Sequence, residues 1–386
     1  MAAAACRRKV AARRDSMNST RRFFPTSILV VLILAGSAAA QIRTVLVSPV
    51  PGDPVASGTA LRNALAGISS PSSTNRWLVK IEPGTFDIGA TALPMRAWVD
   101  IEGSGIGATT IRGNVNGIEL NTGAINGASN TELRMLTVTN SVGGPGAQNS
   151  IALYNNTVSS MRLYRVKFTS TAGTGSAWGM RNFQSAPLIE ECEFSVSASG
   201  SAAYGLVYFF IVSSGERSSI LRSKIAVSGA TNNYGVYMTE AQTLTVLRDS
   251  RIDVTGGQFT YGLYATGIWQ GNESLAIRDT EISSAGGAQA SYGVRFDLGT
   301  TVALDIASSK IWGHVAPTTY GISQGGNAPM GLQGASIVGF TKTIESVSNA
   351  SIASTGLTGG PVSVSGWVGC MGVWDENGVF YAQSCP

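Results

Sequence analysis

One nine-residue phrase recurs along this chain at a near-constant spacing and restricts its fold more than any other feature of the sequence. It is clearest at Leu247 to Thr255, L-R-D-S-R-I-D-V-T. Its central apolar residue returns at steps of 26 to 31 residues. The recurring positions are Ile81, Ile111, Val138, Phe168, Phe194, Ile225, Ile252, Ile282, Ile311 and Ile337. A repeat of about 20 to 50 residues indicates a stack of similar structural units.

Each copy of the phrase alternates in polarity as a β-strand with one buried face does. Two residues before the central position lies a small or apolar residue, and the residue between the two is polar and usually charged. The small or apolar residues are Thr109, Leu136, Val166, Cys192, Ser223, Ser250, Thr280, Ser309 and Ala335. The polar residues are Thr110, Thr137, Lys167, Glu193, Lys224, Arg251, Glu281 and Lys310. The sequence therefore predicts one such strand in every unit, with its polar column in solvent.

A second phrase, an aromatic residue followed by glycine, alternates with the first. Its copies are Trp178-Gly179, Tyr204-Gly205, Tyr234-Gly235, Tyr261-Gly262, Tyr292-Gly293 and Tyr320-Gly321, each followed by an apolar residue. Each unit then has at least two strands, and parallel strands about 4.8 Å apart stack like side chains on like. The two-residue period of a strand predicts that Tyr234, Val236 and Met238 face one side and Tyr237 the other.

Thr59 to Ile68 is the best helical stretch of the chain. Leu61, Leu65 and Ile68 fall on one face, Thr59 is suited to cap the start, and Gly67 lies near the end. The open end of a β stack exposes its apolar core, and repeat folds need terminal caps. We expect this helix to cover the first coil.

Residues Trp77 to Gly113 carry a resemblance to a known family. A strand ending in P-G-T-F (Pro83–Phe86) is followed by I-E-G-S-G-I-G-A-T-T-I-R-G (Ile101–Gly113). This arrangement resembles the entry segment of the pectin-lyase-like superfamily. The resemblance implies an all-β protein with a right-handed parallel β-helix, and the repeat extends it to about nine to ten coils. The expected division is a secretion signal over 1–40, an N-terminal segment with the capping helix over 41–76, the β-helix over 77–352 and a C-terminal tail over 353–386.

The C-terminal tail and the cysteines carry further signals. Asn377-Gly378 separates two short apolar runs, which is a strong β-hairpin signal. Cys370 and Cys385 lie on opposite arms, and in an exported protein we expect them to form a disulfide. Cys192 falls in the small-residue position of the first phrase, so we interpret it as a buried core residue.

Residues 1–40 have the features of a secretion signal. Arg21 and Arg22 precede an apolar run from Ile28 to Leu34, which is too short for a comfortable membrane span. Ala38-Ala39-Ala40 offers a cleavage site. Met17 is an alternative start, and the twin-arginine route is an alternative to the general export route. We expect a secreted, periplasmic or cell-surface protein with no membrane span after cleavage.

The positive charge of the chain is concentrated in this predicted signal. The first 40 residues hold seven basic side chains and one acidic one, a net charge of +6, which leaves −2 for the remainder of a chain whose total is +4. No basic patch remains outside the signal, so we expect no nucleic-acid partner.

The catalytic strings of the superfamily's enzymes have no match here. The resemblance implies that an active site would use paired acids, or calcium with a basic residue. Galacturonan hydrolases carry the segments N-T-D, D-D, G-H-G and R-I-K, and pectate lyases carry W-I-D-H and R-x-P-x-x-R. None of these strings occurs.

Glu191 and Glu193 are predicted to face outward on one strand, about 6.5–7 Å apart, a separation compatible with an inverting glycosidase. Their neighbours Lys167 and Lys224 favour the ionised form of both carboxyls, which argues against a general acid. The only histidine, His314, is predicted at a surface turn. With a single imidazole in the chain, we expect no metal site and no cofactor. The sequence identifies no catalytic residues.

The outward side of the aromatic–glycine strand is the candidate binding surface. If the apolar set faces the core, Phe209, Tyr237, Tyr264, Arg295 and Asp297 recur on the outer face of successive coils. Flat rings stack on the apolar face of a sugar, and Arg295 is suited to fork onto a carboxylate. Alternatively, the rings shield the sheet or meet a loop or a second subunit. The charged column of the first phrase alternates in sign, which we interpret as holding the register of the coils, with a polysaccharide groove as the alternative.

The sequence as a whole favours a non-catalytic exported protein that binds a polysaccharide or a cell-surface component along one face of the solenoid. A divergent polysaccharide lyase or glycoside hydrolase is the alternative, and a purely structural cell-surface protein is a third. The sequence specifies neither the ligand nor the oligomeric state.

Overall fold

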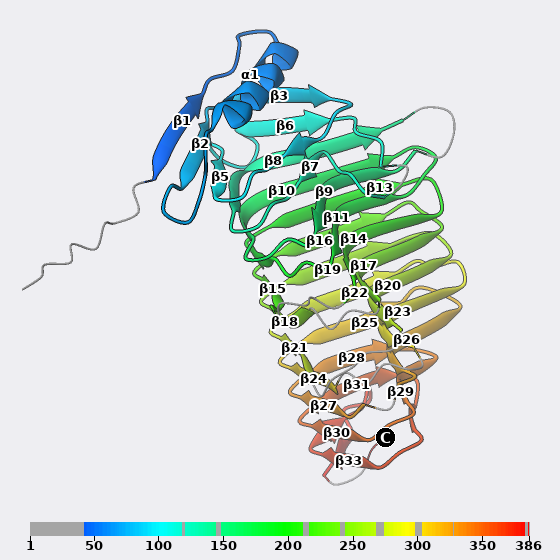
Figure 1. Ribbon diagram of the computed structural model, residues 1–386. Helices are drawn as coiled ribbons and strands as arrows, with labels where there is room; N and C mark the ends of the chain where they lie inside the picture. Colours follow the sequence, from blue (N-terminus) through cyan, green and yellow to red (C-terminus); the bar gives the residue numbers. More distant parts are fainter. Residues whose placement is uncertain are drawn as a thin grey trace, which may run out of the picture. The chain divides into compact units, whose positions relative to one another are not determined.

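The computed structural model describes residues 42–382 and 385, except 118–119, 144–147, 211–215, 240–243, 268–273, 298–302 and 327 (Figure 1). The predicted secretion signal lies outside the described residues. No helix within the described ranges is long and apolar enough to cross a membrane.

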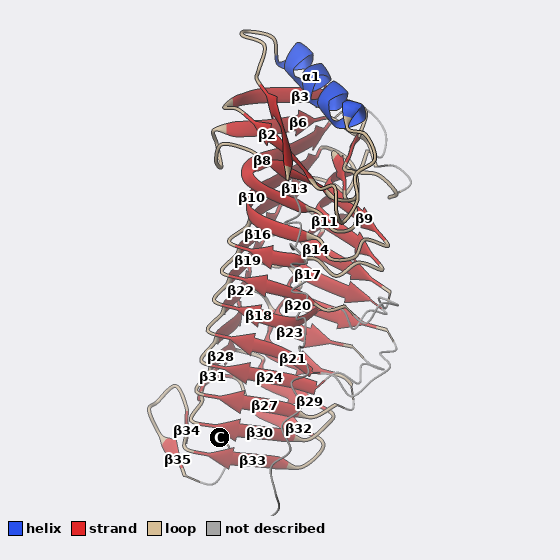
Figure 2. Ribbon diagram, turned by 60° about the vertical axis from the view of Figure 1, so that its left-hand side comes forward, coloured by secondary structure: helices blue, strands red, loops and turns tan. Residues whose placement is uncertain are grey.

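The described chain winds into coils of three strands, and each strand pairs in parallel with its equivalent in the next coil (Figures 1 and 2). Lys224–Ser228, for example, pairs residue by residue with Arg251–Thr255. Three sheets result. The long strands β8 and β10 run around a corner and contribute to both the first and the second sheet. The sequence predicted at least two strands for each coil, in the second and third sheets, and the structure adds the strand of the first sheet.

The first sheet contains β1 (Arg43–Val47), β2 (Trp77–Ile81), β5 (Val99–Glu102), β8 (Glu132–Val142), β10 (Arg162–Ala172), β12 (Leu188–Glu190), β15 (Ser218–Leu221), β18 (Leu244–Arg248), β21 (Ser274–Arg278), β24 (Ala303–Ala307), β27 (Met330–Gln333), β30 (Ala350–Ala353) and β33 (Val368–Met371). The second sheet contains β3 (Gly84–Gly89), β6 (Thr109–Gly113), the later parts of β8 and β10, β13 (Glu193–Ala198), β16 (Lys224–Ser228), β19 (Arg251–Thr255), β22 (Glu281–Ala285), β25 (Lys310–His314), β28 (Ser336–Gly339), β31 (Gly356–Gly359) and β34 (Val373–Trp374). The third sheet contains β4 (Leu93–Pro94), β7 (Ile125–Asn126), β9 (Ser150–Asn156), β11 (Ala177–Phe183), β14 (Ala202–Phe209), β17 (Asn232–Thr239), β20 (Phe259–Thr266), β23 (Ala290–Phe296), β26 (Thr318–Gln324), β29 (Lys342–Ser346) and β32 (Val362–Val364).

The described part of the chain is therefore an all-β, right-handed parallel β-helix with one helix, as predicted. It has about eight regular turns, slightly fewer than the nine to ten predicted. The difference arises at the two ends, where the third sheet continues only as two- or three-residue strands: β4, β7 and β32. Parallel pairing also continues past residue 352, because β33 pairs with β30 and places Cys370 beside Ile352.

The interior is built from columns of equivalent apolar residues. Ile225, Ile252, Ile282, Ile311 and Ile337 pair in register in the second sheet and are 0–1% exposed. The predicted column is correct from Ile111 onward. Its first member is wrong, because Ile81 ends β2 in the first sheet and Phe86 of β3 pairs with Ile111 instead.

The nine-residue phrase contains a corner between two strands. Asp249, between β18 and β19, has a φ of 51°, in the left-handed region that lets the chain turn. Equivalent corners hold Met135, Arg165, Glu191, Arg222, Asp279, Ser308, Gly334 and Ser354, with φ between 48° and 59°.

Buried hydroxyls stabilise these corners. The Ser223 hydroxyl donates to the Leu221 carbonyl at 2.8 Å and accepts the Cys192 backbone N–H at 3.1 Å. Ser250, Thr280 and Ser309 repeat both bonds in the next coils. The small-residue column of the sequence is thus partly a chain of hydrogen bonds that links successive corners.

Cys192 occupies this column as a thiol. It is 1% exposed, its Sγ lies 3.4 Å from the Glu190 carbonyl, and burial raises the pKa of the thiol to about 12. The predicted role as a small buried residue agrees with this position.

We expect Cys192→Ser to change the free energy of unfolding by less than about 1 kcal/mol, because a serine hydroxyl there would make the bonds that Ser223 makes. Urea unfolding of the two proteins checks this. In the native wild type, 5,5′-dithiobis(2-nitrobenzoate) should leave the thiol unmodified at neutral pH and react only after denaturation. Rapid native labelling would contradict the buried assignment.

The glycine of the aromatic–glycine phrase faces the core. A Cβ added at Gly235 would overlap the Ile252 side chain and the Gly262 carbonyl oxygen. A Cβ would likewise overlap an isoleucine side chain of the second sheet at the equivalent glycines of the other coils, which are Gly205, Gly262, Gly293 and Gly321. Glycine at this position lets the second and third sheets approach closely.

Gly235→Ala should therefore destabilise the protein by about 2–4 kcal/mol through overpacking. Gly67→Ala is the matched control, since an added Cβ there meets nothing within 4 Å. Thermal or urea unfolding of both variants measures the difference. Equal stability of the two would show that the core can absorb the extra methyl group.

The helix α1 (Pro54–Gly67) covers the first coil, against β3 (Figure 2). Leu61, Leu65 and Ile68 are 0–3% exposed and join the core, as predicted. The predicted start is wrong by five residues, because Asp53 caps the helix by accepting the Ala56 N–H at 2.9 Å and Pro54 is the first helical residue.

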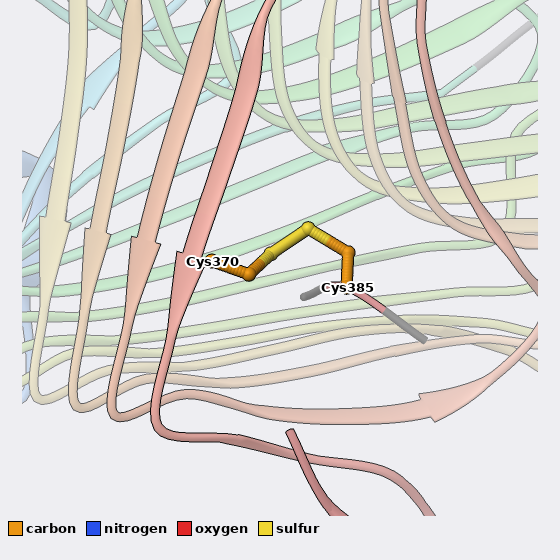
Figure 3. The surroundings of a disulfide bond; sticks show 2 residues. All are labelled: Cys370 and Cys385. Carbon is orange, nitrogen blue, oxygen red and sulfur yellow. A yellow bond between two sulfur atoms is a disulfide. The ribbon is translucent and has the colours of Figure 1, made fainter. Parts of the chain in front are cut away.

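The C-terminal hairpin and disulfide are as predicted. β34 pairs antiparallel with β35 (Phe380–Tyr381), and the Asp375 carboxylate accepts the Asn377 and Val379 N–H groups, each at 2.9 Å. Cys370 in β33 is bonded to Cys385, with 5.3 Å between their Cα atoms (Figure 3). The disulfide therefore ties the end of the described chain to the last coil.

Candidate functional site

A stack of aromatic rings follows the outer face of the third sheet. We call Trp178, Tyr204, Tyr234, Tyr261, Tyr292 and Tyr320 the ring stack. Successive ring centroids are 4.9–5.4 Å apart and successive planes differ by 1–9°. Each inner ring is therefore stacked between the rings of the two neighbouring coils.

The outward position of these rings corrects one prediction. Tyr234 was expected on the same side as Val236 and Met238, but its ring contacts that of Tyr237 at 5.3 Å, on the outer face. Both Gly235 and Val236 face the core. Two adjacent inward residues break the two-residue period, and glycine permits this because it has no side chain to place.

A second column lies beside the ring stack and contains most of the predicted site. In register along the sheet it runs Arg181, Val207, Tyr237, Tyr264, Arg295, Ser323 and Glu345. We call this the outer column. The predicted outward direction of Tyr237, Tyr264 and Arg295 is the one the structure shows.

The five predicted site residues form one connected surface. The rings of Phe209 and Tyr237 are 6.3 Å apart, and those of Tyr237 and Tyr264 are 5.4 Å apart. The Tyr264 hydroxyl donates to Asp297, and Arg295 Nε donates to Asp297 Oδ1 at 2.7 Å.

Tyr237 and Tyr264 are oriented differently from the ring stack. The Tyr237 plane is turned by 66° from that of Tyr204 and by 68° from that of Tyr234. Tyr264 is turned by 34° and 36° from Tyr234 and Tyr261. These two rings therefore lie across the edges of the stack and remain half-buried rather than enclosed.

Arginine side chains lie over rings at the two ends of the surface. Arg181 is 4.7 Å from the centroid of Phe209, so the exposed part of that ring is partly covered. Arg295 is 4.7 Å from the centroid of Tyr292. Both contacts are cation–π interactions, each contributing about 0.5–2 kcal/mol.

An open depression lies at the Arg295 end. It has a volume of about 500 Å³ and is lined by Thr266, Arg295, Phe296, Asp297, Ser323 and Gly325. The side chains of Arg295 and Asp297 are 30% and 29% exposed. The sequence pattern did not indicate Ser323 as a lining residue, although Ser323 occupies the outward position of its strand in register with Arg295.

The environment shifts the pKa values of this surface. Burial raises the pKa of Tyr204 and of Tyr261 to about 12 and raises those of Tyr234 and Tyr264 further. Burial opposes the charge of Arg295, but the hydrogen bond and charge of Asp297 outweigh it and raise the pKa of the guanidinium.

These tyrosines make stability depend on alkaline pH. A tyrosine ionises near pH 10 in the unfolded chain and near pH 12 in the folded one, so the unfolded state releases protons first. The stabilisation is complete below about pH 10 and is lost as the pH rises through 12.

We expect the free energy of unfolding, measured in urea, to fall steeply between about pH 10 and 12. Tyr204→Phe keeps the stacked ring and removes the ionising group. That variant should match the wild type at pH 8 and lose less stability at pH 11. An identical alkaline fall in both proteins would contradict a contribution from Tyr204.

Glu191 and Glu193, the acidic pair whose spacing was considered for a glycosidase, each lie in ion pairs. Glu191 occupies a corner with a φ of 53°, so it does not share a strand with Glu193, and the spacing predicted from an extended strand does not apply. Its partners are Arg165 at 2.6 Å and Arg222 at 3.4 Å rather than the predicted lysines. The hydrogen bond from Arg165 is the largest of the contributions that lower the pKa of Glu191. The adjacent Glu190 is held ionised in the same way, first by a hydrogen bond from Arg162.

The alternating charges of the second sheet also pair. Lys167 lies 3.6 Å from Glu193, and Arg251 lies 3.4 Å from Glu281. At the like-charged step between Lys224 and Arg251, Arg251 turns to Asp253 at 2.6 Å. This pairing supports the interpretation that the column holds register.

His314 ends β25 within the second sheet, where the Ser283 hydroxyl lies 3.1 Å from its Nε2. It was predicted at a turn. Burial lowers the pKa of the imidazole. Among the described residues, no group of three or more His, Cys, Asp or Glu side chains is arranged to hold a metal ion.

The strand pairing defines the class of protein: the chain is a right-handed parallel β-helix, which is the fold that the P-G-T-F and I-x-G-x-G segments suggested. No protein-family model matches the sequence, and no curated protein matches it either.

Solved structures share the fold at low sequence identity. The A-module of the mannuronan C-5 epimerase AlgE4 of Azotobacter vinelandii is 15% identical, with 84% of this chain and 89% of that chain covered and a TM-score of 0.48. The polygalacturonase of Erwinia carotovora is 9% identical over 83% and 95% of the chains, with a TM-score of 0.41. Tailspike protein 3 of bacteriophage CBA120 is 11% identical over 83% and 48%, with a TM-score of 0.41.

Proposed function

We propose that this protein binds a polysaccharide or another cell-surface glycan along the outer face of the third sheet and does not cleave it. The observation that carries the proposal is the connected surface of Tyr237, Tyr264, Arg295 and Asp297. Tyr237 and Tyr264 lie across the ring stack and are half-buried, and an aromatic ring that is partly accessible can contact the apolar face of a sugar.

The repeat of the coils suits a polymer as ligand. Equivalent positions recur at about 4.8 Å along the stack, so every second coil roughly matches the length of one to two sugar units. A ligand with its own repeat can therefore meet similar contacts on several coils.

A binding role without catalysis agrees with the acidic groups. Glu190 and Glu191 are held ionised by arginines, so neither is suited to protonate a leaving group at neutral pH. The Cys370–Cys385 disulfide supports a location outside the cytoplasm, and the secretion signal predicted from residues 1–40 agrees with it.

Tyr237→Ala combined with Tyr264→Ala should abolish retention on immobilised polysaccharides that hold the wild type. The two rings lie outside the main core, so we expect the melting temperature to fall by only several degrees, with an unchanged circular dichroism spectrum. Tyr164→Ala, a tyrosine of the first sheet, is the control and should bind as the wild type does.

The same panel of acidic and neutral polysaccharides separates binding from catalysis. Release of reducing or unsaturated ends by the wild type would contradict the non-catalytic role. If the double variant unfolds, the two rings belong to the packing and the binding role for them is wrong.

A further inference from the structure

Among the described residues that line the depression at the Arg295 end, the positive and negative charges cancel. Arg295 is paired with Asp297 at 2.7 Å, and the Tyr264 hydroxyl also donates to this carboxylate. Two coils further along the sheet, Glu345 of the outer column is paired with Lys342 at 2.5 Å. These two cations and two anions balance.

This balance decides what the depression can hold. A uronic acid would bring a carboxylate to a guanidinium that Asp297 already neutralises, and two carboxylates on one guanidinium repel each other. Leaving the Arg295–Asp297 pair in place also keeps the Tyr264 hydroxyl bonded. An acidic sugar would have to break these hydrogen bonds or bring its carboxylate close to the negatively charged Asp297.

A neutral sugar meets no such penalty. Its hydroxyl groups both donate and accept, so they are suited to a wall in which the cationic donor Arg295 lies beside the carboxylate acceptor Asp297. The Ser323 hydroxyl, which donates to Glu345 at 3.3 Å, adds a polar group between the two ion pairs. The rings of Tyr264 and Tyr292 next to Arg295 supply the apolar part of the surface.

We propose that the depression beside Arg295 and Asp297 selects neutral, hydroxyl-rich sugar units over uronic acids. The inference rests on the proposed glycan binding and names the ligand class for that same surface. It reverses the role expected for Arg295 from the sequence, which was to bind a ligand carboxylate, because Asp297 supplies that carboxylate from within the protein.

The test uses polymers that differ only in their carboxylates. Polygalacturonate and alginate are each compared with their carboxyl-reduced forms, in which every carboxylate has become a hydroxymethyl group. Affinity electrophoresis or retention on the immobilised polymers at about 150 mM salt, where long-range attraction is screened, measures the preference. We expect the wild type to be retained more strongly on the reduced member of each pair that it binds.

Asp297→Asn removes the internal carboxylate and keeps the shape of the side chain. Arg295 is then uncompensated, and we expect affinity for the acidic members to rise by about tenfold, as one new charge-assisted hydrogen bond would give. Asp305→Asn is the matched control, because Asp305 is paired with Arg278 in the first sheet and the variant changes the net charge equally.

The outcomes separate this inference from the function on which it rests. Tyrosine-dependent retention that is stronger on the acidic polymers leaves glycan binding intact and overturns the neutral preference. An equal gain in Asp297→Asn and Asp305→Asn assigns the effect to net charge and also overturns it. No retention of the wild type on any polymer of the wider panel would falsify the proposed function and the inference together.

Discussion

In-register parallel hydrogen bonding between successive coils is the interaction on which the rest of this structure depends. It places every residue about 4.8 Å from its equivalents, so each column of side chains must be compatible with its own repetition. Apolar residues satisfy this by stacking, as Ile252 does on Ile282. Hydroxyl groups satisfy it by accepting hydrogen bonds from the backbone of the neighbouring coil, and tyrosine rings satisfy it by stacking on one another. Charged columns satisfy it only when the sign alternates or when a neighbouring column supplies the opposite charge, and both solutions occur here.

The same repetition explains which parts of the fold could be predicted from the sequence. A column that recurs in many coils gives many observations of one pattern, so the buried isoleucines and their register were predictable. At each end of the solenoid, by contrast, the sequence pattern occurs only once. Ile81 was placed in the wrong column because Phe86, after a turn, takes that place in the first coil. The helix start was placed at Thr59, although Asp53 followed by Pro54 is itself a start signal. There the apolar periodicity began later than the helix, since its first turn contributes little to the core.

The candidate site was predictable to the extent that it obeys the two-residue period. That period identified Tyr237, Tyr264 and Arg295 as outward residues of neighbouring coils. It failed at Tyr234, because Gly235 and Val236 both face inward and shift the phase by one residue. It also gave no sign that Arg295 and Asp297, two residues apart, pair with each other instead of with a ligand. Such pairing depends on how far each side chain reaches and in which direction, which a pattern of residue types does not encode.

The outer column differs from the other columns in what its side chains add to the fold. The ring stack supports the register that backbone pairing sets in the third sheet, because its rings stack on one another from Trp178 to Tyr320. Tyr237 and Tyr264 form a second layer over the edges of that stack, away from the main core, and they bury less surface than a core aromatic does. Arg295 and Asp297 extend this layer with a pair whose charges cancel. A surface that joins half-exposed rings to a neutralised ion pair contributes modestly to stability, yet it combines the apolar and polar contacts that a sugar requires. This second layer is therefore the part of the surface on which the proposed binding role rests.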